Sequence, residues 1–142
     1  MIETVYIELP FEKITYLDRP EFYQEGEKDF KDALTQSMKD YGIKDPVYCW
    51  ANGKAYGNII KVIVGNNRMV VAKELGIKTI PAIVTNFKAD EFPLKGEVLE
   101  TDAEIKKLFH LPNQLQIRRD ENGNVDQVMP VYYSGKVREE YV

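Results

Sequence analysis

Four consecutive residues have the types and the order that phosphate binding requires. They are Gly65, Asn66, Asn67 and Arg68, and we call them the junction. A glycine lets the chain turn from a strand into a helix, whose start presents backbone N–H groups and the positive end of the helix dipole. Arg68 adds a fork-shaped donor that suits the oxygens of a phosphate. The junction therefore predicts an anion site, with the alternative that Gly65 only makes the turn and Arg68 pairs with a nearby acid.

The segments on either side of the junction are those that would position it. The β-branched run at residues 60–64 predicts a buried strand, and both asparagines of the junction are good helix caps. A helix over residues 69–75 follows, and Gly76 stands where a helix commonly ends. This order of strand, glycine and helix occurs in many proteins, so the junction needs support from the rest of the chain.

Composition and charge limit the class of protein. The chain has 142 residues, 44% of them hydrophobic, which is enough for one core and too few for two comfortable domains. Its formal charge of −4 argues against a surface that is wholly a nucleic-acid footprint. One cysteine and one histidine exclude a disulfide framework, and we expect no metal site. The chain has no membrane-length apolar run and no signal-peptide pattern at its start, so we expect a cytoplasmic protein without a membrane partner.

The chain before the junction predicts a strand, a helix and a hairpin. Residues 5–9 alternate as a strand does, and Pro10 ends them. One helical stripe ends at Gly42 and consists of Phe30, Ala33, Leu34, Met38 and Tyr41. Residues 47–50 read as a strand, in which Cys49 is a core filler rather than a nucleophile. Asn52-Gly53 predicts a hairpin turn that leads back to residues 59–64.

Five acidic residues crowd the segment that precedes this helix. They are Asp18, Glu21, Glu25, Glu27 and Asp29. The simpler interpretation is a solvated loop, and the alternative is that one of them is a catalytic carboxylate facing the anion site. The sequence does not identify which residue that would be, so no catalytic residue is assigned.

After the junction, residues 80–84 predict a strand that Pro81 would restrict to an edge or a first position, and residues 86–99 predict a connecting loop. A capping box over residues 101–104 begins a short helix. His110 would lie in its last turn, where a partial positive charge interacts favourably with the helix dipole. Residues 115–117 and 128–133 flank Asn122-Gly123 as a hairpin. The adjacent Arg118 and Arg119 would point to opposite faces of it and so form no shared patch.

The order of these segments resembles the ParB N-terminal/sulfiredoxin-like superfamily. The resemblance covers roughly residues 3–86 and rests on four stretches, which are Asp18-Arg19-Pro20, Leu34 with Ser37-Met38, Gly42-Ile43 with Pro46-Val47, and Val64 to Arg68 followed by Leu75-Gly76 and Ile80 to Val84. It implies a compact α+β fold with a small mixed sheet and two core helices. To this we expect a C-terminal helix and β-hairpin to be added, with residues 1–90 as the core and 91–142 packed on it.

The family also implies nucleotide phosphates at the glycine-to-helix junction, with further contacts from Gly42, Ile43 and Pro46 near the base or sugar. The chain departs from the family at two positions. At the junction, partition proteins have the sequence Gly-Glu-Arg-Arg, and sulfiredoxin has its catalytic cysteine just after the glycine. In this chain Asn66 stands in place of both that glutamate and that cysteine. The glutamine that usually precedes the proline is Asp45. Sulfiredoxin chemistry is therefore not expected. Without the glutamine, the sequence gives no reason to expect recognition of cytosine.

Three hypotheses about function follow. The first is a domain that binds a nucleotide, with or without Mg²⁺, or another phosphate-bearing small molecule. Such a domain could also have phosphotransfer or hydrolase activity. The second is a non-catalytic interaction module for a protein or DNA partner, which fits the nine tyrosines and six phenylalanines. The third is a ParB-like nuclease that holds Mg²⁺ with its acidic N-terminal loop. Fold alone does not decide among them.

Overall fold

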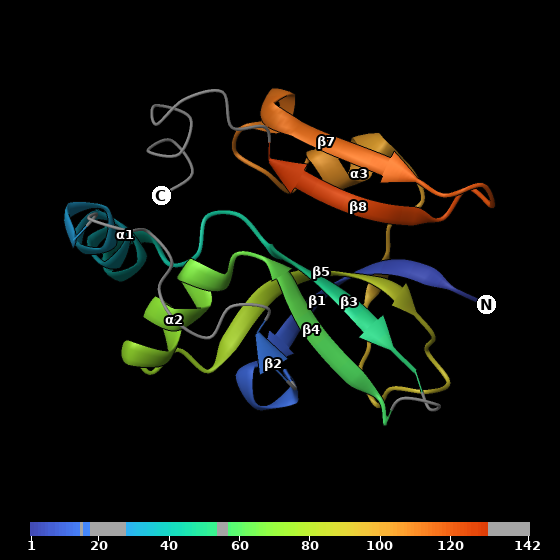
Figure 1. Ribbon diagram of the computed structural model, residues 1–142, viewed down its shortest axis with the longest axis horizontal. Helices are drawn as coiled ribbons and strands as arrows, with labels where there is room; N and C mark the ends of the chain where they lie inside the picture. The colour runs from blue at the N-terminus through green and yellow to red at the C-terminus, as the bar shows by residue number, and fades with distance from the viewer. Residues whose placement is uncertain (15, 18–27, 54–56, 131–142) are drawn as a thin grey trace.

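The structure is a computed structural model that describes residues 1–14, 16–17, 28–53 and 57–130 (Figure 1). Its elements are β1 (Glu3–Pro10), η1 (Phe11–Lys13), β2 (Tyr16–Leu17), α1 (Lys28–Tyr41), β3 (Val47–Asn52), β4 (Ile59–Val64), α2 (Asn66–Glu74), β5 (Thr79–Phe87), β6 (Glu97–Val98), α3 (Asp102–Lys106), η3 (Pro112–Gln114), β7 (Leu115–Arg119) and β8 (Val125–Pro130). Six strands form one sheet in the order β2-β4-β3-β5-β1-β6, and β7 pairs with β8 in a second sheet. The large sheet is mixed, because β3 runs parallel to β5 while β1 runs antiparallel to it. The predicted α+β class is confirmed.

The central sheet is apolar on both faces. Successive side chains of a strand point to opposite faces, so a strand of consecutive apolar residues contributes to both. In β3, Val47 and Cys49 belong to one hydrophobic cluster, whereas Tyr48 between them belongs to a second. Likewise in β5, Ala82 and Val84 face the first cluster and Ile83 faces the second. A sheet that buries both faces needs a covering layer on each side, and the chain supplies two different layers.

Helices α1 and α2 contribute buried side chains to the first cluster, and they lie beside one another at one end of the molecule (Figure 1). Among the described side chains of α1, the buried ones are Leu34 and Met38, one turn apart. The predicted stripe was too wide, since Ala33 is exposed and Tyr41 is 73% exposed at the end of the helix. Helix α2 ends at Glu74 with Leu75 as its C-cap, so Gly76, with a φ of 71°, stands at the predicted position just after the helix.

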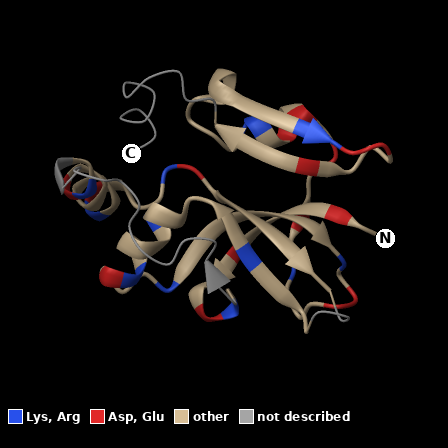
Figure 2. Ribbon diagram, viewed as in Figure 1, with Lys and Arg blue, Asp and Glu red and all other residues tan. Residues whose placement is uncertain are grey.

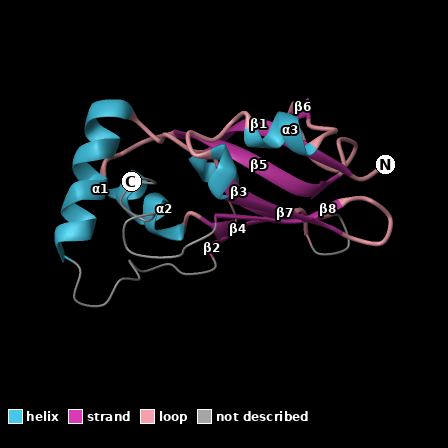
Figure 3. Ribbon diagram, turned by 90° about the horizontal axis from the view of Figure 1, so that it is seen from above, coloured by secondary structure: helices cyan, strands magenta, loops and turns pink. Residues whose placement is uncertain are grey.

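The layer over the second face is the predicted C-terminal helix and hairpin, and both are present. Ile105 of α3 and Val128 of β8 are buried with the sheet residue Ile83 in the second cluster. Thr101 caps α3 as predicted, because its hydroxyl accepts from the Glu104 backbone N–H at 3.2 Å, and the Glu104 carboxylate lies 3.1 Å from the same hydroxyl. Seen from above, α3 and the hairpin lie over the strands, while α1 stands beyond the end of the sheet (Figure 3).

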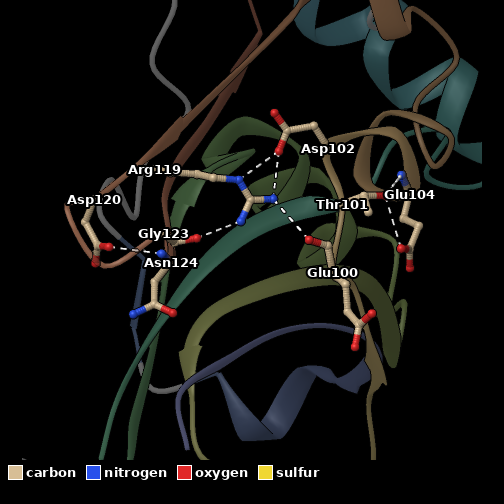
Figure 4. Close-up of polar contacts among 8 residues, drawn as sticks. All are labelled: Glu100, Thr101, Asp102, Glu104, Arg119, Asp120, Gly123 and Asn124. Atoms are coloured by element: carbon tan, nitrogen blue, oxygen red, sulfur yellow. Dashed lines mark hydrogen bonds and ion pairs between the residues drawn. The ribbon is translucent and has the colours of Figure 1, made fainter.

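One arginine ties the hairpin to the start of α3 (Figure 4). Arg119 donates through Nε and Nη2 to Oδ1 of Asp102, at 3.0 and 2.7 Å. Its Nη1 also donates to the carbonyl of Gly123 in the hairpin turn at 2.8 Å. Arg118 instead pairs with Asp126, at 2.6 Å between Nη2 and Oδ2. The two adjacent arginines therefore form no shared patch, as the strand geometry predicted.

Two predictions about the chain after α2 were wrong. Pro81 does not lie in an edge strand, because β5 is flanked by β3 and β1. The strand tolerates it because pairing with β3 begins one residue later, at Val47 opposite Ala82. The predicted loop at residues 86–99 is also shorter than expected. Strand β5 continues to Phe87, and β6 adds a two-residue strand beside β1.

Charged residues are mixed on the helical side of the molecule. Figure 2 shows acidic and basic residues alternating along α1 and the loop after it, as the sequence of α1, KDFKDALTQSMKDY, also does. Alternating signs of this kind are typical of a solvated face rather than of a nucleic-acid footprint. None of the helices in the described part of the chain is long and apolar enough to cross a membrane.

Candidate functional site

The junction has the turn that the sequence predicts, with one change in its cap. Gly65 is itself the N-cap of α2, and its φ of 107° lies in the left-handed region that a side chain disfavours. The two asparagines therefore stand inside the first turn of the helix, and the prediction that they cap it was wrong. Asn66 donates from its side chain back to the carbonyl of Ile63 at 3.1 Å, which fixes the end of β4 against the start of the helix.

Gly65 also leaves no room for a side chain. A Cβ atom at this position would lie 2.7 Å from Cγ1 of Val47 and 2.9 Å from Nη2 of Arg68. Both distances are shorter than any ordinary carbon contact. The glycine thus lets β3 and the guanidinium of Arg68 approach the turn at the same time.

Arg68 connects the junction to the loop between α1 and β3. Its Nη1 donates to the carbonyl of Asp45 at 2.5 Å and reaches the carbonyl of Pro46 at 3.4 Å. Both acceptors are backbone oxygens, and they orient the guanidinium toward this loop. The arrangement places a cation in the first turn of α2, at the positive end of the helix dipole.

The loop after α1 is the second group of predicted site residues. Gly42 ends α1 in the left-handed region, with its N–H donating to the carbonyl of Met38 at 3.0 Å. Ile43 packs against the core beside the helices, and Pro46 leads into β3. The side chain of Lys44 crosses the ring of Tyr41, with Nζ 5.2 Å from the ring centroid. Through Arg68, the structure brings this loop and the junction together at one end of β3.

Asp45 is a residue whose importance the sequence did not reveal. Its side chain is fully buried, and Oδ1 accepts from the backbone N–H of His110 at 2.9 Å and from Nδ1 of the same residue at 2.7 Å. Its Oδ2 has no hydrogen-bond partner among the described residues. The only hint was an acid at the entrance to an apolar strand, directly before Pro46.

The structure corrects the interpretation of His110. Helix α3 ends at Lys106, so His110 is not in its last turn and does not serve its dipole. It lies instead in the segment between α3 and η3, where its ring and its backbone both bind Asp45. A carboxylate that accepts from Nδ1 fixes the orientation of the imidazole ring.

Cys49 lies near this end of the sheet but is closed to solvent. Its exposed fraction is 0%, and burial raises the pKa of the thiol to about 12, against a smaller lowering by the charge of Arg68. A thiol with so high a pKa is a poor nucleophile at neutral pH. This burial supports the interpretation of Cys49 as a core residue.

The structure does not describe the side chains of the acidic residues among which a catalytic carboxylate was considered. The acidic residues Asp18, Glu21, Glu25 and Glu27 lie outside the described residues, and the side chain of Asp29 is likewise not described. Within residues 1–14, 16–17, 28–53 and 57–130, no three His, Cys, Asp or Glu side chains gather as metal ligands would. A pocket of about 650 Å³ lies at the far end of β5, between Glu3, Phe87 and Val98, and none of the predicted site residues lines it.

The comparisons with known proteins concern the same part of the chain. The family described as the ParB N-terminal domain matches residues 2–94. Sulfiredoxin from Arabidopsis thaliana is 19% identical, with 60% of this chain and 89% of that chain covered and a TM-score of 0.46. No curated protein matches the chain.

Two solved ParB structures are also similar. The C-terminally truncated chromosome-partitioning protein ParB from Caulobacter crescentus, complexed with CTP-gamma-S, is 18% identical, with 62% of this chain and 47% of that chain covered and a TM-score of 0.44. A Pnob8-like ParB-N domain is 16% identical, with 76% of this chain and 36% of that chain covered and a TM-score of 0.43. The present chain thus spans less than half of either ParB chain.

Proposed function

Because the chain belongs to the ParB N-terminal domain family, whose match covers residues 2–94, we propose that it binds the phosphate groups of a nucleotide at the junction. The observation that carries the proposal is the position of Arg68. Its guanidinium lies against Gly65 at the start of α2 and bonds to the carbonyls of Asp45 and Pro46. A helix start, a fixed guanidinium and a close-packed glycine together form a site suited to phosphate.

In this proposal the residues have distinct roles. The backbone N–H groups of the first turn of α2, at Asn66 and Asn67, contact phosphate oxygens, and Arg68 supplies the positive charge. Gly42, Ile43 and Pro46 form the opposite wall, on the side of the base or sugar. The contact between Arg68 and this loop supports the assignment, because it links the loop to the start of α2.

The first test is ligand binding. We expect the thermal midpoint of the protein to rise in the presence of CTP, ATP or GTP, measured with and without Mg²⁺. A ligand present at 100 times its dissociation constant adds about 2.7 kcal/mol to the free energy of unfolding. Release of inorganic phosphate from a nucleotide that binds would separately test the hypothesis of phosphotransfer or hydrolysis.

The variant Arg68→Ala tests the site itself. Loss of a charge-assisted contact of about 1.5–3 kcal/mol should weaken nucleotide binding roughly tenfold to hundredfold. Arg68→Lys should recover only part of this loss, because an ammonium group cannot reproduce the guanidinium fork. Since Arg68 also binds two loop carbonyls, the alanine variant should lose about 1 kcal/mol of stability as well. Affinity is therefore measured by calorimetry at a temperature where every variant is folded.

The matched control is Arg118→Ala, which removes an arginine of the hairpin whose side chain is 66% exposed. Its nucleotide affinity should equal that of the wild type. If Arg68→Ala also bound nucleotides as the wild type does, the phosphate site would be excluded. The alternative of an interaction module would then remain, and Tyr41 is the observation in its favour, because its ring is 73% exposed beside the loop after α1.

A further inference from the structure

Asp45 belongs to two contacts that lie on different sides of the central sheet. Its backbone carbonyl accepts from Nη1 of Arg68, in the first turn of α2, which covers the first face. Its carboxylate accepts twice from His110, which follows α3 in the layer that covers the second face. One residue is therefore shared between the proposed phosphate site and the C-terminal layer.

The contact with His110 is a strong constraint on the loop. The Asp45 side chain is fully buried, and in the described part of the chain both of its hydrogen bonds come from His110 to the same oxygen. A buried carboxylate that loses such donors is left without compensation for its lost hydration, so it must move or take up water. A shift of the backbone at Asp45 that brought its carboxylate to water would also displace its carbonyl, which accepts from Arg68.

We propose that His110 is a positioning residue of the phosphate site, acting through Asp45 on the guanidinium of Arg68. The proposal rests on the proposed function, and it extends the site beyond residues 2–94, the part that matches the family. In reciprocal fashion, changes at Arg68 alter the docking of the segment around His110, because a coupling between two sites acts in both directions.

The experiment uses the full chain and inorganic tripolyphosphate as the probe. His110→Ala removes the Nδ1 donor and keeps the backbone N–H, whereas His110→Asn places an amide nitrogen where Nδ1 stands. The control is Arg119→Ala, which loosens the same layer through Asp102 and Gly123 and makes no contact with Asp45. All variants are titrated by calorimetry at a temperature where each one is folded.

We expect His110→Ala to bind tripolyphosphate roughly threefold to tenfold more weakly than the wild type. His110→Asn should stay within about twofold of the wild type, and Arg119→Ala should be unchanged, since it lowers stability without touching Asp45. The inference is overturned if His110→Ala binds as the wild type does, or if Arg119→Ala weakens binding by as much as His110→Ala.

A second measurement needs no ligand and separates the two proposals. The backbone N–H of His110 donates to Asp45, so its hydrogen exchange reports on that contact. In Arg68→Ala this amide should exchange faster, while amides of the β7–β8 ladder keep their wild-type rates. If the wild type binds neither tripolyphosphate nor CTP, ATP or GTP, the proposed function fails, and the exchange rates alone decide the coupling. Unchanged exchange at His110 would overturn the coupling even if the phosphate site is real.

Discussion

Gly65 combines two demands that only glycine meets, a left-handed backbone and the absence of a Cβ atom beside Val47 and Arg68. We expect Gly65→Ala to lower the free energy of unfolding by about 2–4 kcal/mol, from backbone strain and overpacking together. It should also weaken nucleotide binding, because the new methyl group displaces the guanidinium. Urea denaturation and calorimetry on the same variant measure both effects.

Gly76 provides the comparison for this prediction. Its φ of 71° is also left-handed, but a Cβ atom there would meet nothing within 4 Å. Gly76→Ala should therefore cost only the backbone term, about 1 kcal/mol, and leave binding unchanged. Equal losses of stability in the two variants would show that the close packing at Gly65 does not contribute to the cost of Gly65→Ala.

Cys49 should resist modification in the folded protein. Its thiol is fully buried and burial raises its pKa to about 12, so neither access nor ionisation favours reaction at neutral pH. We expect labelling by a thiol reagent at pH 7 to be at least about a hundredfold slower in buffer than in denaturant. Labelling at the same rate under both conditions would contradict this description of the core.

The sequence predicted those site residues that are close together along the chain. It did not predict the contact between residues that are far apart along the chain. Gly65 and Arg68 stand three positions apart between a strand and a helix, so local propensities suffice to find them. Asp45 and His110 are 65 positions apart, and no local pattern marks a contact of that kind. Only the packing of the C-terminal layer against the sheet brings them together.

At the scale of elements, the hairpin depends on Arg119 rather than on Arg118. Arg119 binds Asp102 at the start of α3 and the carbonyl of Gly123, with its side chain 32% exposed (Figure 4). We expect Arg119→Ala to lower the free energy of unfolding by about 1–2 kcal/mol. Arg118→Ala breaks an exposed pair and should cost less than about 0.5 kcal/mol. Thermal or urea unfolding of both variants measures the difference, and equal costs would be evidence against this tie between α3 and the hairpin.

The elements themselves were largely predictable, because alternation and capping signals are local. Strands β1, β3 and β4, helices α1 and α2, the capping box at Thr101 and the C-terminal hairpin all follow such signals. The two failures in the chain after α2 depend on partners. Pro81 occupies a central strand because pairing with β3 starts after it, and β6 is a strand only because β1 lies beside it. Neither fact is encoded within the segment concerned.

For the molecule as a whole, stability should fall in alkaline solution. Burial, the largest cause, raises the pKa of Tyr48 to about 12, and it does the same for Tyr6, which also donates to Glu8. Because the pKa of a tyrosine in the unfolded chain is near 10, the unfolded state loses these protons first. The stabilisation is complete below pH 10 and is lost as the pH rises through 12.

Tyr48 can contribute at most about 1.4 kcal/mol per pH unit to this decline, and the more exposed Tyr6 contributes less, because solvent screens its interactions. Urea denaturation between pH 9 and 11 measures the slope. Tyr48→Phe should be less stable at pH 9, since it loses the hydrogen bond to the carbonyl of Asp126, but its stability should fall less steeply above pH 10. An identical slope in the variant and the wild type would exclude Tyr48 as a source of the alkaline instability.

The pairing of β1 with β5 has a consequence for the order of events during synthesis. Glu3 lies opposite Phe87 and Leu9 opposite Ile80, so β1 leaves the ribosome well before β5, the strand with which it pairs. Until then Val5, Ile7 and Leu9, all destined for the core, remain uncovered on a strand with open edges. Such non-local pairing slows folding and prolongs exposure to other chains. The nascent protein is therefore most in need of a chaperone before β5 emerges.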